Sequence, residues 1–179
     1  MKNPYKILIL LFAVLLFMQC NTVDKLTEFD ISYSYEYDLP ESPGIDIPLD
    51  LYTPGLETDS EDVYELHDTR KDLVEEVYLK EVKLKITMPE DGKFDFLRTV
   101  KIYIRAMDTE ETLIAWKEEI SDGQGPVLYF NTTSKDLQKY LKKDQIVFRF
   151  NTLTDDPIEQ DMKIQIHSIF HVNAKILGI

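Results

Sequence analysis

The stretch FDISYSYEYDL, residues 29–39, decides the fold class. Six apolar or aromatic residues alternate along it with five polar or charged ones. Successive side chains of a β-strand point to opposite faces, so this alternation predicts a half-buried strand. Pro40 and the Ser42-Pro43-Gly44 cluster predict its end. We expect the core side of this strand to carry the three tyrosines, which share their parity with Ile31 and Leu39: Tyr33, Tyr35 and Tyr37.

The same period of two recurs along the rest of the chain. It is found in segments 45–51, 77–88, 100–106, 146–150 and 162–176, and shorter strands are expected at 113–116 and 127–130. Pro48 lacks a ladder N–H and predicts an edge position for the first of these segments. A change of parity near Lys80-Glu81 predicts a β-bulge. The last segment would reach about 50 Å, so we expect a bend or bulge near Ser168.

One short helix is expected between the later strands. Ser134 is the candidate N-cap, and Leu137, Tyr140 and Leu141 follow at helical spacing. Eight or nine strands separated by turn signals, with one short helix, predict an all-β fold: an antiparallel β-sandwich over residues 29–179. A closed barrel is the competing architecture, because length and pattern do not separate the two.

The first twenty residues, MKNPYKILILLFAVLLFMQC, have a different character. Lys2 and Lys6 precede an unbroken apolar run over residues 7–18. A bilayer core of about 30 Å needs roughly 20 helical residues, so the run is too short to span it and fits the apolar region of a signal peptide. The only cysteine, Cys20, follows the run after Gln19.

This arrangement resembles the bacterial lipoprotein signal peptide. The resemblance implies that residues 1–19 are removed and that Cys20 receives a lipid, which makes residues 20–28 a tether to the sandwich domain. Two acyl chains anchor a protein stably where one does so marginally. Asn21 stands where some inner-membrane lipoproteins carry Asp, so the resemblance favours the outer membrane. The strand pattern also resembles that of β-sandwich lipoproteins from bacteria with an outer membrane.

Composition excludes several classes of protein. The formal charge of −13 argues against nucleic acid as a partner, because phosphate binding needs a basic surface. One cysteine cannot form a disulfide within the chain. Removal of residues 1–19 takes away two lysines and no acid, so the charge becomes −15.

No residue pattern predicts catalysis, a metal site or a cofactor. His167 and His171 lie on a predicted strand, where four residues separate them by about 13 Å, too far apart for one zinc ion. His67 has no nearby His or Cys in the sequence. The acidic segments 57–62 and 155–161 offer oxygen ligands for Ca²⁺, but neither has EF-hand order, and we interpret both as solvated loops.

Trp116, the only tryptophan, is the candidate ligand-binding residue. Its parity is opposite to that of Leu113 and Ala115, so core packing is one interpretation and exposure for stacking on a sugar ring is the other. The sequence as a whole favours a non-enzymatic envelope lipoprotein, exported and anchored through its lipid, that serves as a structural or protein-interaction module. A glycan-binding module is the alternative, and a hydrolase is less favoured.

Overall fold

The computed structural model describes residues 28–43, 48–121 and 123–175. The elements in chain order are β1 (Glu28–Leu39), β2 (Pro48–Tyr52), β3 (Leu56–Glu57), α3 (Ser60–Glu65), a 3₁₀ turn (Lys71–Leu73), β4 (Val74–Met88), β5 (Leu97–Ala106), β6 (Thr112–Lys117), β7 (Val127–Tyr129), β8 (Asn131–Thr132), α4 (Gln138–Leu141), β9 (Gln145–Thr154) and β10 (Met162–Ala174). The predicted strands all form, although residues 45–47 and Ile176 lie outside the described part of the chain. Two strands of only two residues each, β3 and β8, were not predicted.

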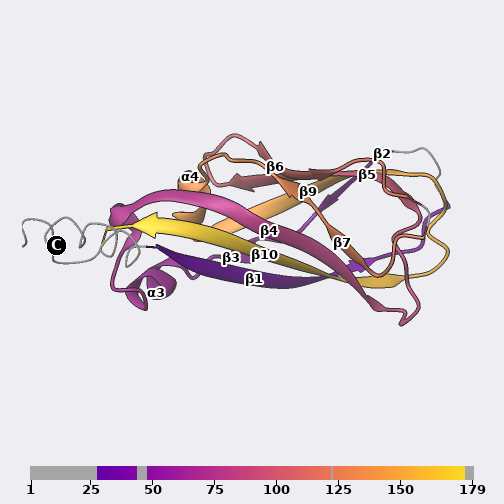
Figure 1. Ribbon diagram of the computed structural model, residues 1–179, viewed down its shortest axis with the longest axis horizontal. Helices are drawn as coiled ribbons and strands as arrows, with labels where there is room; N and C mark the ends of the chain where they lie inside the picture. Colours follow the sequence, from indigo (N-terminus) through magenta and orange to yellow (C-terminus); the bar gives the residue numbers. More distant parts are fainter. Residues whose placement is uncertain (1–27, 44–47, 122, 176–179) are drawn as a thin grey trace, which may run out of the picture.

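The strands form two antiparallel sheets packed face to face, as Figure 1 shows. One sheet has the order β1-β10-β4-β7, and the other has the order β2-β9-β5-β6-β8 with β3 attached to β9. The pairing is nested: β1 pairs with β10, β2 with β9, β4 with β7 and β5 with β6. This nesting is the jelly-roll form of a β-sandwich. The predicted sandwich is therefore confirmed over the closed barrel.

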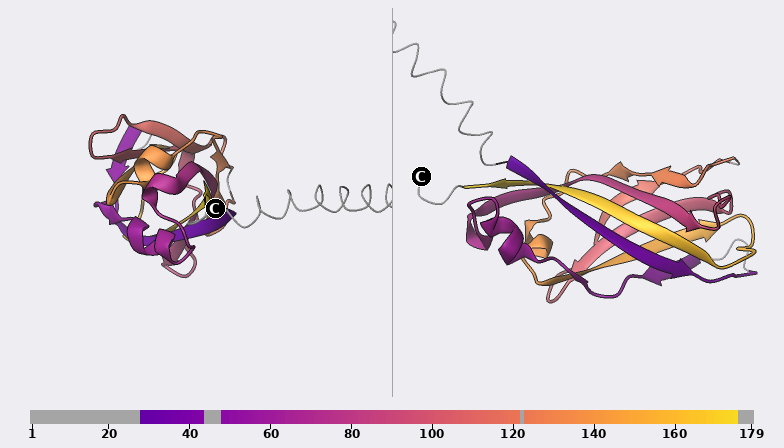
Figure 2. Two further views of the ribbon diagram at one scale, coloured as in Figure 1. Left: turned by 90° about the vertical axis from the view of Figure 1, so that its left-hand side faces the viewer. Right: turned by 90° about the horizontal axis from the view of Figure 1, so that it is seen from below.

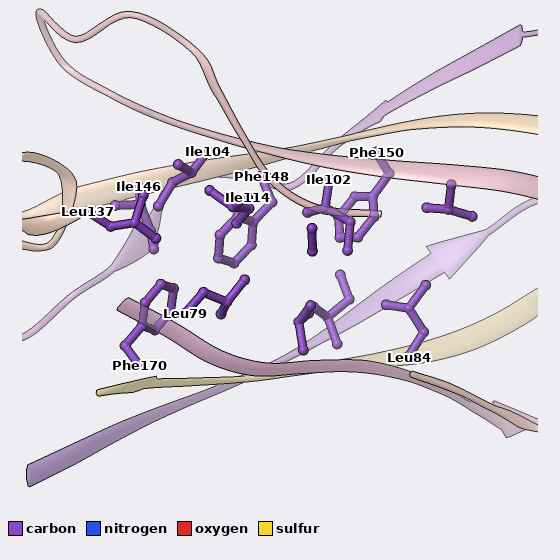
Figure 3. Close-up of a cluster of buried hydrophobic side chains, with 14 of the residues drawn as sticks. Leu79, Leu84, Ile102, Ile104, Ile114, Leu137, Ile146, Phe148, Phe150 and Phe170 are labelled. Atoms are coloured by element: carbon purple, nitrogen blue, oxygen red, sulfur yellow. The ribbon is translucent and has the colours of Figure 1, made fainter. Parts of the chain in front are cut away.

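The core lies between the two sheets. Figure 3 shows Leu79, Leu84 and Phe170 of the four-stranded sheet pointing toward side chains from β5, β6 and β9. These residues are buried because each occupies the inward parity of its strand, as in the strict alternation of β10. Tyr33, Tyr35 and Tyr37 are half-buried and pack against the same core, so the prediction that they face inward is confirmed.

Two predicted irregularities of the sheets are present. Ile169 pairs with Glu81 while the next residue, Phe170, pairs with Leu79, which leaves Lys80 as an extra residue in β4. This is the bulge that the change of parity predicted. A bend or bulge was also predicted near Ser168 of β10. The register does shift there, between Ile169 and Phe170, but the extra residue belongs to β4 and not to β10. The edge position of β2 is confirmed as well.

The helix prediction was wrong in two respects. Leu137, Tyr140 and Leu141 are buried as expected, but α4 starts at Gln138, after Leu137, and Ser134 does not cap it. The carboxylate of Asp136 instead accepts the backbone N–H groups of Gln138 and Val77, each at 3.0 Å. A second helix, α3, forms within the segment interpreted as an acidic loop.

Helix α3 forms because one of its side chains reaches the core. Tyr64 is fully buried, and its hydroxyl donates a hydrogen bond of 3.2 Å to the carbonyl of Leu141. The ring of Phe29 in β1 packs edge-on against that of Tyr64, with 6.3 Å between the ring centroids. The acidic residues of α3 lie on its exposed side, in agreement with the interpretation of this segment as solvated.

Candidate functional site

On the outer face of the six-stranded sheet, three aromatic side chains and one arginine occupy two neighbouring cross-strand rows. Arg149 of β9 lies between Tyr52 of β2 and Tyr103 of β5 in one cross-strand row. The next row contains Asn151, Lys101 and Trp116. Side chains directly opposite each other in an antiparallel pair share a face, so all of these groups point away from the core. We call the surface formed by Tyr52, Tyr103, Trp116 and Arg149 the aromatic face.

Trp116 reaches this face because β6 has a bulge. Ala115 pairs with Ile102 and Leu113 pairs with Tyr103, so Ile114 is the extra residue and turns inward. Trp116 then lies opposite Lys101 and takes the outward side, where it is half-buried. The parity argument for core packing assumed a regular strand and does not hold past the bulge.

Arg149 is held by contacts in several directions. Its Nη1 lies 2.6 Å from Oδ1 of Asp50, and its Nη2 lies 2.6 Å from Oε1 of Glu111. The guanidinium carbon lies 4.1 Å from the ring centroid of Tyr103, in cation–π contact. Asn151 donates a further hydrogen bond of 2.9 Å to Asp50. Only 16% of the Arg149 side chain is exposed, so the guanidinium is held in place at the centre of these contacts.

These contacts lower the pKa of both carboxyl groups. The hydrogen bond from Asn151 and that from Arg149 hold the pKa of Asp50 below its ordinary value of 3.8. Arg149 likewise holds the pKa of Glu111 below 4.5. The two carboxylates in turn raise the pKa of Arg149, with Glu111 contributing most.

A pH-dependent contribution to stability follows from these shifts. A carboxyl group with a lowered folded-state pKa stabilises the fold above its unfolded pKa, and loses that contribution as the pH falls through the folded value. Arg149→Met is therefore expected to make the loss of unfolding free energy below about pH 4.5 shallower than in the wild type. Urea denaturation at a series of pH values between 7 and 3 measures this. Equal slopes in the two proteins would show that the ion pairs do not act on stability.

The outer face of the four-stranded sheet is of a different kind. Polar and charged residues dominate it, and they pair across strands, as Lys163 does with Asp38 at 2.8 Å and His171 with Asp30 at 2.8 Å. His167 hydrogen-bonds to Ser34 on the same surface. Both histidines are half-buried on the outward side of β10.

The structure does not bring His67 and the acidic loop 155–161 together. His67 stacks on Phe29 at 4.0 Å, where β1 begins. The loop 155–161 contacts the other end of β1, through Asp161 and the backbone N–H of Glu41. The length of β1, about 40 Å, separates the two.

Neither acidic loop gathers metal ligands. Beside the first turn of α3, the ammonium group of Lys71 lies between Glu61 and Asp144, at 3.3 and 2.8 Å. Within residues 28–43, 48–121 and 123–175, no three His, Cys, Asp or Glu side chains gather closely enough to hold a metal ion.

One apolar cavity lies between the sheets, near the edges formed by β1 and β2. Its volume is about 40 Å³, and Tyr37, Leu49, Leu51, Phe150 and Ile164 are among its lining residues. This space is about that of one water molecule and is far smaller than the 300–1,000 Å³ typical of ligand pockets. It is a packing gap and not a site for a small molecule.

Only one member of the aromatic face was singled out from the sequence. Tyr52, Tyr103 and Arg149 alternate with inward residues on three separate strands, and nothing local marks them as a group. Knowledge of the strand order would have found them, because the pairing of β2, β9, β5 and β6 places them side by side. Cys20, the candidate lipidation site, lies outside the described residues.

Comparisons with known proteins add little to this description. No protein-family model and no curated protein matches the chain. Among solved structures it is similar to a chain of turnip yellow mosaic virus, at 10% identity and a TM-score of 0.28, covering 84% of this chain and 97% of that one. It is also similar to a decameric BFDV capsid protein, at 9% identity and a TM-score of 0.33, covering 82% and 98%. Likenesses this weak carry no functional information.

Proposed function

We propose that this protein is a non-enzymatic lipoprotein of the bacterial cell envelope that binds a partner protein through its aromatic face. The anchor is Cys20, which follows the apolar run of the signal-like segment. Seven residues lie between it and Glu28, so the eight Cα–Cα steps of the tether reach at most about 29 Å. In the described part of the chain, no helix is long and apolar enough to cross a membrane. The outer membrane is the proposed location.

Attachment through Cys20 would bring the end of the domain that carries the start of β1 toward the bilayer. Glu28 at the start of β1 and Ala174 at the end of β10 lie at the end that carries α3, as Figure 2 shows. Anionic headgroups repel a domain of charge −15, so attachment would depend on the lipid and not on surface charge. The aromatic face runs along the side of the sandwich and stays accessible in this orientation.

The composition of the aromatic face is the observation that carries the binding proposal. Tyr, Trp and Arg are the residues enriched at the energetic centres of protein interfaces, and the aromatic face presents all three. Tyr52 is 50% exposed, and the side chain of Arg149 beside it is already held by Asp50 and Glu111. A partner would thus meet rigid groups whose ordering costs little entropy.

A glycan is the second candidate ligand of the same face. The outward position of Trp116 favours it, since aromatic rings on a sheet surface can stack on sugar rings. Asp50 and Asn151, next to Arg149, supply hydrogen-bonding groups of both kinds. The two candidates differ in what they require, because stacking on sugar depends on Trp116 and a protein interface depends more on the exposed Tyr52.

Binding through the aromatic face can be tested with matched tyrosine variants. Tyr52→Ala is expected to weaken capture of an envelope protein by photo-crosslinking in intact cells at least tenfold, as loss of an interface hot spot does. Tyr129→Ala is the control, because Tyr129 is similarly exposed (56%) but lies on the other sheet. Equal loss in both variants, or in neither, contradicts the proposal.

The glycan alternative has its own readout. Full-length protein in detergent is tested for binding to purified envelope polysaccharides, with Trp116→Ala beside the wild type. Binding that is lost in Trp116→Ala, without any crosslinked protein, would replace the protein partner by a glycan.

A further inference from the structure

Among the described residues the two sheets have five edge strands, and one differs from the rest. The edge strands β7, β3 and β8 have three, two and two residues, and β2 has five and begins at Pro48. β1 has twelve residues. Among the described residues it pairs only with β10, so its second side presents backbone N–H and C=O groups that take part in no ladder.

Three of the usual devices that blunt a sheet edge are missing along β1: short length, proline and a bulge. It contains no proline or glycine, and all twelve of its residues pair with β10 without a register shift. Short length, proline and bulges each prevent a further strand from adding to an edge. β1 therefore keeps the continuous, regularly paired backbone that an added strand needs.

The inward row of β1 offers apolar surface to such a strand. Ile31 and Leu39 are buried, while the tyrosines between them are only half-buried, because no further strand lies beside them: Tyr33, Tyr35 and Tyr37. Tyr37 also lines the small cavity together with Leu49 and Leu51 of β2, both half-buried. An apolar seam thus follows the free edge between the two sheets.

The outward row of β1 is acidic. Glu28, Asp30, Glu36 and Asp38 alternate with the inward residues, and the strand contains no Lys or Arg. Asp30 and Asp38 are paired to lysines of the sheet, at 2.5 and 2.8 Å. Opposite charges placed directly across a strand pair stabilise it, and like charges destabilise it. A second copy of β1 is disfavoured on this ground.

We propose that the free edge of β1 accepts an extended segment of another protein as an added strand, in which apolar residues alternate with Lys or Arg. The apolar residues of the segment would cover Tyr33, Tyr35 and Tyr37, and its basic residues would lie beside the acidic row. Main-chain hydrogen bonds supply affinity in this mode and the alternating side chains supply specificity. This surface is separate from the aromatic face and does not depend on it.

The test uses full-length protein in detergent and a capped eleven-residue peptide in which valine alternates with lysine and threonine. A peptide of the same composition, with its valines and lysines in separate blocks, is the control ligand. We expect fluorescence anisotropy to show binding of the alternating peptide only. We also expect amide hydrogen exchange to slow at every second residue of β1, because the other amides are already bonded to β10.

Charge-reversed variants locate the contact. Glu36→Lys is expected to weaken peptide binding about two- to tenfold, whereas Glu90→Lys, an equal charge change at an exposed turn, leaves it unchanged. Tyr52→Ala should also leave it unchanged, which separates this proposal from that for the aromatic face. Equal binding of the block peptide, protection without a period of two, or equal effects of the two Lys variants would overturn the proposal.

Discussion

Replacing Phe170 with alanine is expected to lower the free energy of unfolding by about 3–5 kcal/mol. Phe170 is fully buried on the inner side of β10, and its ring meets that of Tyr33 edge-on at 5.9 Å. Its strand lies between β1 and β4, so a cavity there loosens the contacts of three strands at once. Urea denaturation followed by circular dichroism, in the Cys20→Ala background to avoid detergent, gives this quantity.

A surface aromatic serves as the control for Phe170. Tyr129→Ala removes a ring of similar size from an exposed position and is expected to change the unfolding free energy by no more than about 0.5 kcal/mol. Similar losses in the two variants would mean that the region of Phe170 does not form the core of the jelly roll.

Changing Cys20 to alanine is expected to release the protein from the membrane. A chain held by two acyl groups stays with the membrane through an alkaline carbonate wash, and the variant has no site for them. The apolar run over residues 7–18 is too short to span the bilayer if it is retained. Nearly all of the wild type should therefore remain in the washed pellet, and most of the variant should appear in the supernatant.

Asn21→Ala provides the matched control for Cys20→Ala. It alters the neighbouring residue and keeps the thiol, so it should remain in the pellet like the wild type. Retention of Cys20→Ala in the washed pellet would assign the attachment to some other part of the chain.

The strands of this protein could be predicted from the alternation of apolar and polar side chains. Residues 29–39 and 162–174 sit in β1 and β10 with the predicted faces inward, because one buried face imposes a period of two. The bulge at Lys80 could be predicted for the same reason, since one extra residue inverts the parity of the inward side chains that follow it in the strand.

Features that depend on contacts between residues distant in the sequence could not be predicted. Helix α3 exists because Tyr64 reaches the carbonyl of Leu141, 77 residues later in the chain. The start of α4 at Gln138 is held by Asp136, whose carboxylate accepts the N–H of Gln138 and that of Val77 on β4. In both cases a tertiary contact overrode the local signal for a loop or for a serine cap.

The aromatic face could be predicted only in part. Trp116 drew notice as the only tryptophan, but its side of the strand was ambiguous until the bulge at Ile114 was known. Tyr52 and Arg149 belong to strands almost a hundred residues apart, and the strand order alone makes them neighbours. Long-range pairing of this kind has no local pattern in the sequence.

The proposed place of this protein in the envelope depends on the chemistry of Cys20. Mass spectrometry of the N-terminal peptide from protein purified out of membranes tests it directly. We predict a mature chain that begins at Cys20, with a diacylglycerol thioether on Sγ and an acyl group on the new α-amino group. A chain that retains residues 1–19, or one whose Cys20 carries a free thiol, would contradict the account.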